Sequence, residues 1–266
     1  MEGANGKQQK HFVLVHGAGH GAWCWYKLKP LLESSGHKVT AIDLVASGIN
    51  AKRLDEVDTL HEYSLPLLEL MAAIPPGEKV ILVGHSFGGF STAIAMEHYP
   101  EKISIAVFIA SVMPDAVNPP SYFFNLVFEW SPKDEDPLDT KIEEYGSPDQ
   151  PRTAIRYGPK YLSSKVYQNC TSEEIELANL LLRPISLFAE DLSKAKAFSA
   201  EGYGSVKRAY IICNEDKSFP VGFQHWLVEN VGVIESKVIK GADHMAMISK
   251  PQQLRQCLQE IADKVV

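Results

Sequence analysis

Short apolar runs recur along the chain and are separated by longer stretches with helical spacing. The runs contain many β-branched residues, which favours strands. They lie at 11–15, 39–42, 80–83, 105–109, 209–212 and 237–239. The helical patterns lie at 23–33, 60–73, 89–98, 223–229 and 251–265. Because the runs do not alternate apolar with polar residues, both faces of each strand should be covered, which predicts one α/β domain with a mostly parallel, doubly wound sheet.

One long segment interrupts this alternation. Residues 113–200 contain prolines, aromatic side chains and a helical run at 173–182, but no convincing strand. The segment is too long for an ordinary loop between strands. We therefore predict that 1–112 and 201–266 form the core, and that 113–200 forms a helical cap. The cap should cover the carboxyl edge of the sheet, where open α/β sheets bind ligands.

The pentapeptide Gly84-His85-Ser86-Phe87-Gly88 follows one predicted strand directly and precedes a predicted helix. In that setting a G-x-S-x-G sequence places serine on a sharp strand-to-helix turn, where small neighbours let other backbone approach closely. Without the flanking strand and helix, the same five residues would indicate only a glycine-rich turn. Ser86 is therefore the predicted nucleophile of a hydrolase.

A serine nucleophile needs a base, and the base needs an acid that fixes its tautomer. His244 is the predicted base, because it lies on a loop between the last predicted strand and the C-terminal helix. Asp216 follows the preceding strand and gives the chain order serine, acid, histidine that such a fold uses. Glu215 is a rival at the same sheet edge. Asp243 is interpreted as a loop-stabilising residue, since sequence neighbours seldom present side chains in the required geometry.

A loop of small residues follows the first predicted strand. The backbone N–H groups of Ala18 and Phe87 are the predicted donors to the negative charge that develops on the substrate oxygen. Gly17, Gly19 and Gly21 in this loop could also suggest a dinucleotide site. Their spacing lacks the G-x-G-x-x-G pattern of such sites, so we favour the hydrolase interpretation.

Overall charge and composition exclude several classes of partner. The net charge is −7 and lysine and arginine are scattered, which argues against nucleic acid and anionic membranes as partners. The apolar runs have the length of strands, so no membrane-spanning helix is expected. The four cysteines are widely spaced and are predicted to be free thiols. The first ten residues lack an apolar signal core, which predicts a cytoplasmic protein.

Four long segments, 11–44, 78–89, 203–220 and 240–254, resemble the plant methylesterase group of α/β-hydrolases. This group includes methyl salicylate and methyl jasmonate esterases, alkaloid esterases and some hydroxynitrile lyases. The resemblance implies Ser86, Asp216 and His244 as a catalytic triad, and so favours Asp216 over Glu215. It also implies the same two oxyanion donors, a cap over the site, a small-molecule ester as substrate, no metal or other cofactor, and a homodimer.

Two positions distinguish esterases from lyases within this group. The lyases carry threonine directly after the histidine that follows the first strand, and lysine directly after the catalytic histidine. This chain has Gly17 and Met245 at those places. A lysine ammonium would stabilise departing cyanide and a thioether cannot, so the sequence predicts a carboxylic ester hydrolase. A hydroxynitrile lyase and a non-catalytic small-molecule receptor are the alternatives from other classes.

Segments 7–17, 167–170 and 207–226 resemble the alkaloid esterases of the group. This implies a carbomethoxy monoterpenoid indole alkaloid of the polyneuridine aldehyde type, whose freed β-oxo acid then loses carbon dioxide. A methyl salicylate or methyl jasmonate esterase is the alternative. The stretch 117–139 departs from the pattern.

The residues that would bind the substrate are harder to choose. Gly17, His20, Trp130 and Met245 are the predicted substrate-binding residues. The cap segment also supplies further aromatic side chains, some of which could line an apolar pocket: Tyr122, Phe123, Phe124, Phe128, Tyr145, Tyr157, Tyr161 and Phe188.

Overall fold

A six-stranded parallel sheet forms the centre of the molecule, with the strand order β2-β1-β3-β4-β7-β8. The computed structural model describes residues 9–132, 137–147 and 150–265. The sheet strands are β1 (His11–Val15), β2 (Lys38–Ile42), β3 (Val80–His85), β4 (Ile103–Ile109), β7 (Arg208–Cys213) and β8 (Glu235–Ile239). All six predicted strands are therefore present.

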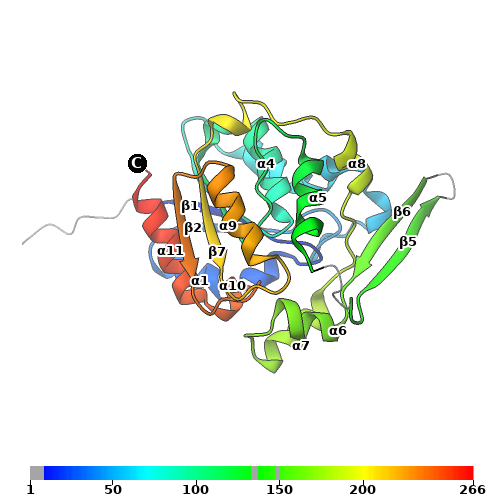
Figure 1. Cartoon of the computed structure of the whole chain (residues 1–266). Coiled ribbons are helices and arrows are strands. Elements are labelled where there is room, and N and C mark those ends of the chain that lie inside the picture. Colours follow the sequence, from blue (N-terminus) through cyan, green and yellow to red (C-terminus); the bar gives the residue numbers. More distant parts are fainter. Residues whose placement is uncertain (1–8, 133–136, 148–149, 266) are drawn as a thin grey trace, which may run out of the picture.

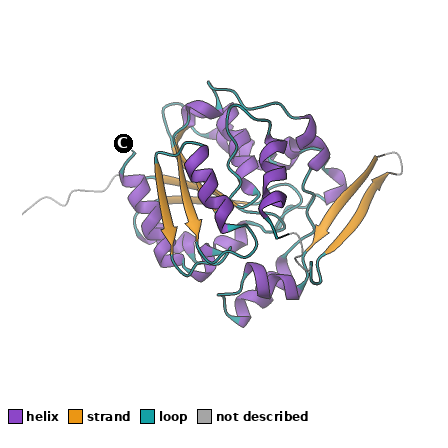
Figure 2. Ribbon diagram, in the orientation of Figure 1, coloured by secondary structure: helices purple, strands orange, loops and turns teal. Residues whose placement is uncertain are grey.

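Helices cover both faces of the sheet (Figures 1 and 2). The helices of the described residues, including those of 113–200, are α1 (Leu28–Ser34), α2 (Leu60–Tyr63), α3 (Leu65–Ala73), α4 (Gly88–His98), α5 (Pro120–Trp130), α6 (Pro159–Tyr161), α7 (Ser172–Leu181), α8 (Ala189–Lys194), α9 (Val221–Asn230), α10 (Ala246–Ser249) and α11 (Pro251–Asp263). Short 3₁₀ turns are η1 (Ala22–Trp25), η2 (Leu54–Glu56), η3 (Pro100–Lys102) and η5 (Tyr203–Ser205), and η4 (Leu162–Val166) is a π turn. Within the described residues, no helix is long and apolar enough to cross a bilayer.

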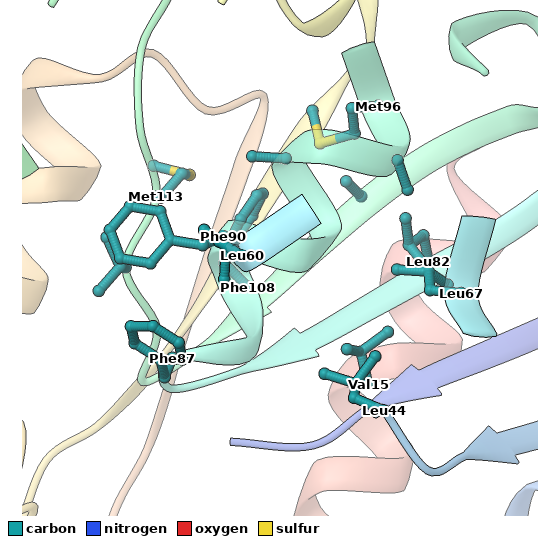
Figure 3. Packing of buried hydrophobic residues seen from close by; sticks show 14 of the residues in the cluster. Val15, Leu44, Leu60, Leu67, Leu82, Phe87, Phe90, Met96, Phe108 and Met113 are labelled. Atoms are coloured by element: carbon teal, nitrogen blue, oxygen red, sulfur yellow. The ribbon is translucent and has the colours of Figure 1, made fainter. Parts of the chain in front are cut away.

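Strand β1 shows why both faces need cover. Its side chains alternate between two buried clusters, with Val13 and Val15 in one and Phe12 and Leu14 in the other. The first cluster packs under α2, α3, α4 and α9, and Figure 3 shows part of it around Phe90 and Leu82. The second packs under α1, α10 and α11. A strand with two buried faces cannot show polar alternation, which is the pattern observed in the sequence.

Two of the predicted helices are interrupted. The pattern at 23–33 is divided into η1 and α1, and the pattern at 60–73 into α2 and α3. Pro30 and Pro66 lie in the first turns of α1 and α3. Proline lacks an N–H and its ring clashes with the carbonyl four residues earlier, so neither helix can extend further toward its N-terminus.

The segment 113–200, which we call the cap segment, contains the expected helices and one element that the sequence did not predict. An antiparallel hairpin pairs β5 (Lys141–Ser147) with β6 (Gln150–Arg156). It lies beyond α5, on the side of the molecule away from α11 (Figure 1). Ile142 is 72% exposed, so β5 lacks the buried apolar run by which the other strands were recognised. This corrects the expectation that the segment contains no strand.

Candidate active site

Ser86 lies on the turn between β3 and α4. Its φ angle of 54° falls in the left-handed region, which is strained for a residue other than glycine. A β-carbon at Gly88 would collide with the carbonyl oxygen of His16, so glycine is required there. Because Val15 pairs with Gly84 in the sheet, the loop that follows β1 lies against this turn.

The structure brings Ser86, His244 and Asp216 into one hydrogen-bonded chain. His244 Nε2 lies 3.0 Å from Ser86 Oγ, and His244 Nδ1 lies 2.7 Å from Asp216 Oδ2. A carboxylate oxygen only accepts, so the imidazole hydrogen sits on Nδ1 and the lone pair of Nε2 faces the serine hydroxyl. His244 and Asp216 are both buried. This arrangement can withdraw the hydroxyl proton when the serine attacks.

The buried carboxylate of Asp216 is fully engaged by hydrogen bonds. Its Oδ1 accepts from the backbone N–H groups of Ser218 and Phe219, each at 2.8 Å. Its Oδ2 accepts from Gln224 Nε2 at 3.2 Å in addition to His244. These donors hold the carboxylate in place.

The rival acid Glu215 and the loop residue Asp243 make their hydrogen bonds elsewhere. Glu215 is exposed and accepts from Asn169 Nδ2 at 2.8 Å. Asp243 accepts from the N–H of Met245 at 3.0 Å, from Ser249 Oγ on α10 at 2.6 Å and from the N–H of Asn169 at 3.0 Å. Burial raises the pKa of Asp243. Asp243 therefore braces the loop that carries His244.

The peptide between Gly17 and Ala18 is fixed by His16. Leu44 donates its N–H to His16 Nε2 at 3.1 Å, which leaves His16 Nδ1–H to donate to the Gly17 carbonyl at 2.8 Å. Burial lowers the pKa of His16 to about 4, so the ring is neutral.

The predicted oxyanion donors are the N–H groups of Ala18 and Phe87. Within the described residues, these two N–H groups have no acceptor, and both residues line the cavity beside Ser86.

His85, the variable residue of the pentapeptide, supports the neighbouring histidine. Its Nε2–H donates to the backbone carbonyl of His244 at 2.9 Å, and the two rings lie 4.6 Å apart. Burial lowers the pKa of His85, which keeps the ring neutral. No pattern in the sequence indicates this contact, because the two residues are 159 positions apart.

A cavity of about 260 Å³ opens at Ser86 and His244. Most of its lining is apolar or aromatic, and the cap segment supplies more than half of it. The lining residues are Ala18, Ser86, Phe87, Val112, Phe124, Val127, Phe128, Ser131, Pro137, Thr140, Ile142, Ile155, Tyr157, Tyr161, Leu187, Ser218, Phe219 and His244. Four of the cap aromatics considered from the sequence, Phe124, Phe128, Tyr157 and Tyr161, are among them.

A smaller cavity of about 30 Å³ also reaches the serine and the histidine. It shares five residues with the larger one: Ala18, Ser86, Tyr157, Ser218 and His244. Its other walls are His20, His85, Leu162 and Val166. Two cavities of very different size therefore meet at the reactive atoms.

None of the four predicted substrate-binding residues lines the larger cavity. Gly17 lies under the turn, where a β-carbon would come 2.8 Å from Ser86 Cβ. Met245 is completely buried in the cluster under α1 and α11. Trp130, at the end of α5, is 43% exposed and its ring lies 6.1 Å from that of Phe223.

His20, the fourth, lines only the smaller cavity. Its Nδ1–H donates to the Ala18 carbonyl at 2.8 Å, so its Nε2 accepts from the Tyr167 hydroxyl at 2.6 Å. Burial lowers the pKa of His20 to about 3. His20 is thus a neutral, fixed wall residue.

Residues 12–256 match the model of the alpha/beta hydrolase family. The chain belongs to the alpha/beta hydrolase family. This α/β-hydrolase is 92% identical to norfluorocurarine synthase 1 of Strychnos nux-vomica over 266 residues, the full length of both chains. It is 59% identical to polyneuridine aldehyde esterase of Rauvolfia serpentina over 260 residues, 98% of each chain.

Solved structures agree with these relatives. The crystal structure of polyneuridine aldehyde esterase superimposes with a TM-score of 0.94 at 58% identity, covering 96% of this chain and 100% of that one. The family, the fold class and the enzyme class predicted from the sequence, a carboxylic ester hydrolase, are thereby confirmed.

Proposed function

We propose that this α/β-hydrolase cleaves the methyl ester of a carbomethoxy indole alkaloid, with Ser86 as the nucleophile. The observation that carries the proposal is the chain from Asp216 through His244 to Ser86, which opens into a large apolar cavity. The names of two relatives, a norfluorocurarine synthase and a polyneuridine aldehyde esterase, support an alkaloid as the acyl part.

In the first half of the reaction, Ser86 Oγ attacks the ester carbonyl while His244 Nε2 takes its proton. Asp216 stabilises the imidazolium that forms, and the N–H groups of Ala18 and Phe87 bind the oxyanion. His244 then returns the proton to the leaving oxygen. Methanol departs and the acyl group stays on the serine.

In the second half, His244 deprotonates a water molecule that attacks the acyl carbonyl, and the proton passes back to Ser86 as the acid leaves. An acid with an oxo group at the β position then loses carbon dioxide. The electrons of the broken carbon–carbon bond form an enol, which takes up a proton at carbon. One ester and one water thus give methanol, carbon dioxide and the decarboxylated alkaloid.

The lining of the larger cavity fits a rigid, ring-rich acyl group. Phe124, Phe128, Tyr157 and Phe219 present aromatic surface, and burial of such surface stabilises a polycyclic ligand. No lysine or arginine of the described residues lines this cavity, so no side-chain cation is available for a departing cyanide. This favours ester cleavage over the lyase alternative.

The test is incubation of the protein with polyneuridine aldehyde, methyl salicylate, methyl jasmonate and mandelonitrile. Products are followed by mass spectrometry, with norfluorocurarine among the products sought in alkaloid mixtures. We expect methanol and a decarboxylated product from the alkaloid at a higher kcat/KM than from either hormone ester. Faster cleavage of a hormone ester would establish the methylesterase alternative, and cyanide release would establish the lyase. Tight binding of an ester without turnover would indicate a receptor.

A further inference from the structure

The smaller cavity lies where one group of the substrate has to go. When Ser86 has attacked, the ester carbon carries the serine oxygen, the oxyanion, the acyl group and the alkoxy group. The acyl group of a polycyclic ester needs the larger cavity, and the oxyanion faces the N–H groups of Ala18 and Phe87. The alkoxy oxygen must lie beside His244 Nε2, because it receives its proton there. The smaller cavity is lined by this same histidine and by Ser86.

We propose that this smaller cavity, walled by His20, His85, Leu162 and Val166, is the alcohol subsite and restricts the enzyme to methyl esters. The inference rests on the proposed esterase function. The cavity measures about 30 Å³. The neighbouring cavity, measured in the same way, is about 260 Å³. The smaller cavity therefore suits the smallest alkoxy group, methoxy, and each further methylene would press against its walls.

The walls of this alcohol subsite are held in place. His20 is fixed by its hydrogen bonds to the Ala18 carbonyl and the Tyr167 hydroxyl. Leu162 and Val166 are buried in η4 and belong to the cluster under α1, α10 and α11. A close-packed wall of this kind resists expansion, so a larger alcohol would have to displace packed side chains.

The same subsite accounts for the second half of the reaction. The attacking water must lie beside His244 Nε2, where the alkoxy oxygen lay before. Once methanol has left, the space is free to admit a water molecule next to the acyl carbonyl. The subsite therefore serves the leaving group and the nucleophilic water in turn.

The inference is tested first on the unmodified protein. Polyneuridine aldehyde is compared with its ethyl and n-propyl ester analogues, and kcat/KM is measured for each. One methylene too many in a fixed apolar pocket lowers kcat/KM by about 10- to 200-fold. We expect a fall of this size from methyl to ethyl and a further fall to propyl. Similar values for all three esters would overturn the alcohol subsite and leave the esterase function intact.

Variants of the cavity walls then test which of the two cavities sets the preference for methyl esters. Val166→Ala and Leu162→Ala enlarge only the smaller cavity and should raise the ethyl-to-methyl ratio of kcat/KM about 10-fold or more. Val127→Ala is the matched control, because Val127 lines only the larger cavity, and it should leave that ratio unchanged. An equal rise in the control would overturn the assignment, as would an unchanged ratio in folded Val166→Ala.

An independent measurement uses added alcohols as acceptors. If the subsite holds the nucleophile of the second half, the acyl-enzyme should pass its acyl group to methanol much more readily than to n-propanol at equal concentration. Equal transfer to both alcohols would contradict the proposal. Absence of turnover with any ester would instead overturn the esterase function, and this inference with it.

Discussion

Asp216 and Glu215 are adjacent, yet only Asp216 lies within hydrogen-bond distance of His244. Asp216→Asn would replace a carboxylate oxygen by an amide and favour the wrong tautomer of the imidazole. We expect kcat to fall by about 10⁴-fold. Glu215→Gln should retain near-native kcat, and methanol release measures both. A larger loss in Glu215→Gln than in Asp216→Asn would contradict the proposed roles.

Three buried histidines around the site should make stability depend on pH. Burial lowers the pKa of His16 to about 4 and of His20 to about 3, and lowers that of His85, from the ordinary 6.5. As the pH falls below 6.5, the unfolded chain takes up protons that the folded chain does not. Proton uptake by the unfolded chain at each of these three positions lowers the free energy of unfolding by about 1.4 kcal/mol per pH unit. This continues until the pH reaches the pKa of that ring in the folded chain.

Stability should therefore be greatest above pH 6.5 and fall steadily from there toward pH 4. Urea unfolding at pH 7, 6 and 5 measures this dependence. His20→Gln retains a hydrogen-bonding side chain without a titrating ring, so its free energy of unfolding should fall less steeply over the same range. Parallel slopes for the variant and the unmodified protein would contradict the account.

At the scale of elements, α5 forms one wall of the larger cavity. Phe124, Val127 and Phe128 follow helical spacing and face the cavity together. Phe124→Ala should lower kcat/KM for polyneuridine aldehyde by about 10- to 100-fold through lost apolar contact, with little change for methyl acetate. Tyr122→Ala on the same helix is the control, since Tyr122 does not line the cavity. Equal effects of the two variants on the alkaloid would contradict this role of α5.

Elements whose burial leaves a pattern in the sequence could be predicted, and others could not. The six sheet strands are buried on both faces, so each appears as a continuous apolar run. The β5–β6 hairpin has polar residues on both faces and a mostly exposed Ile142, so its sequence does not differ from that of a loop. Proline positions, read as chain breaks, would have indicated the interruptions at Pro30 and Pro66.

Some residues of the site could likewise be predicted from the sequence, and others could not. Ser86 follows β3 directly, and Asp216 and His244 lie on the loops after β7 and β8, so chain order and the sheet edge were enough to expect them together. The cavity lining depends on how the cap segment folds over that edge, which no local pattern encodes. Trp130 illustrates this, because the last turn of α5 points it toward Phe223 and away from the cavity.

At the scale of the whole molecule, the cap segment packs into both buried clusters. Phe123 and Ile185 belong to the cluster under α2, α3, α4 and α9. Leu162 and Tyr167 belong to the cluster under α1, α10 and α11. Arg183 also donates to the carbonyl oxygens of the loop that follows β2. We therefore propose that 113–200 and the core at 1–112 and 201–266 form one cooperative unit.

Urea unfolding followed by far-ultraviolet circular dichroism and by tryptophan fluorescence tests this cooperativity. The two transitions should coincide, because loss of the cap would expose apolar residues of both clusters. Two separated transitions would show that the cap segment unfolds independently.

The most direct test of the whole account is methanol release from polyneuridine aldehyde by Ser86→Ala. The variant removes the nucleophile without adding volume, and exposed Ser193→Ala on α8 serves as its control. We predict a fall in kcat on the order of 10⁴- to 10⁶-fold for Ser86→Ala, with unchanged circular dichroism, and near-native turnover for the control. Near-native turnover by folded Ser86→Ala would contradict the account.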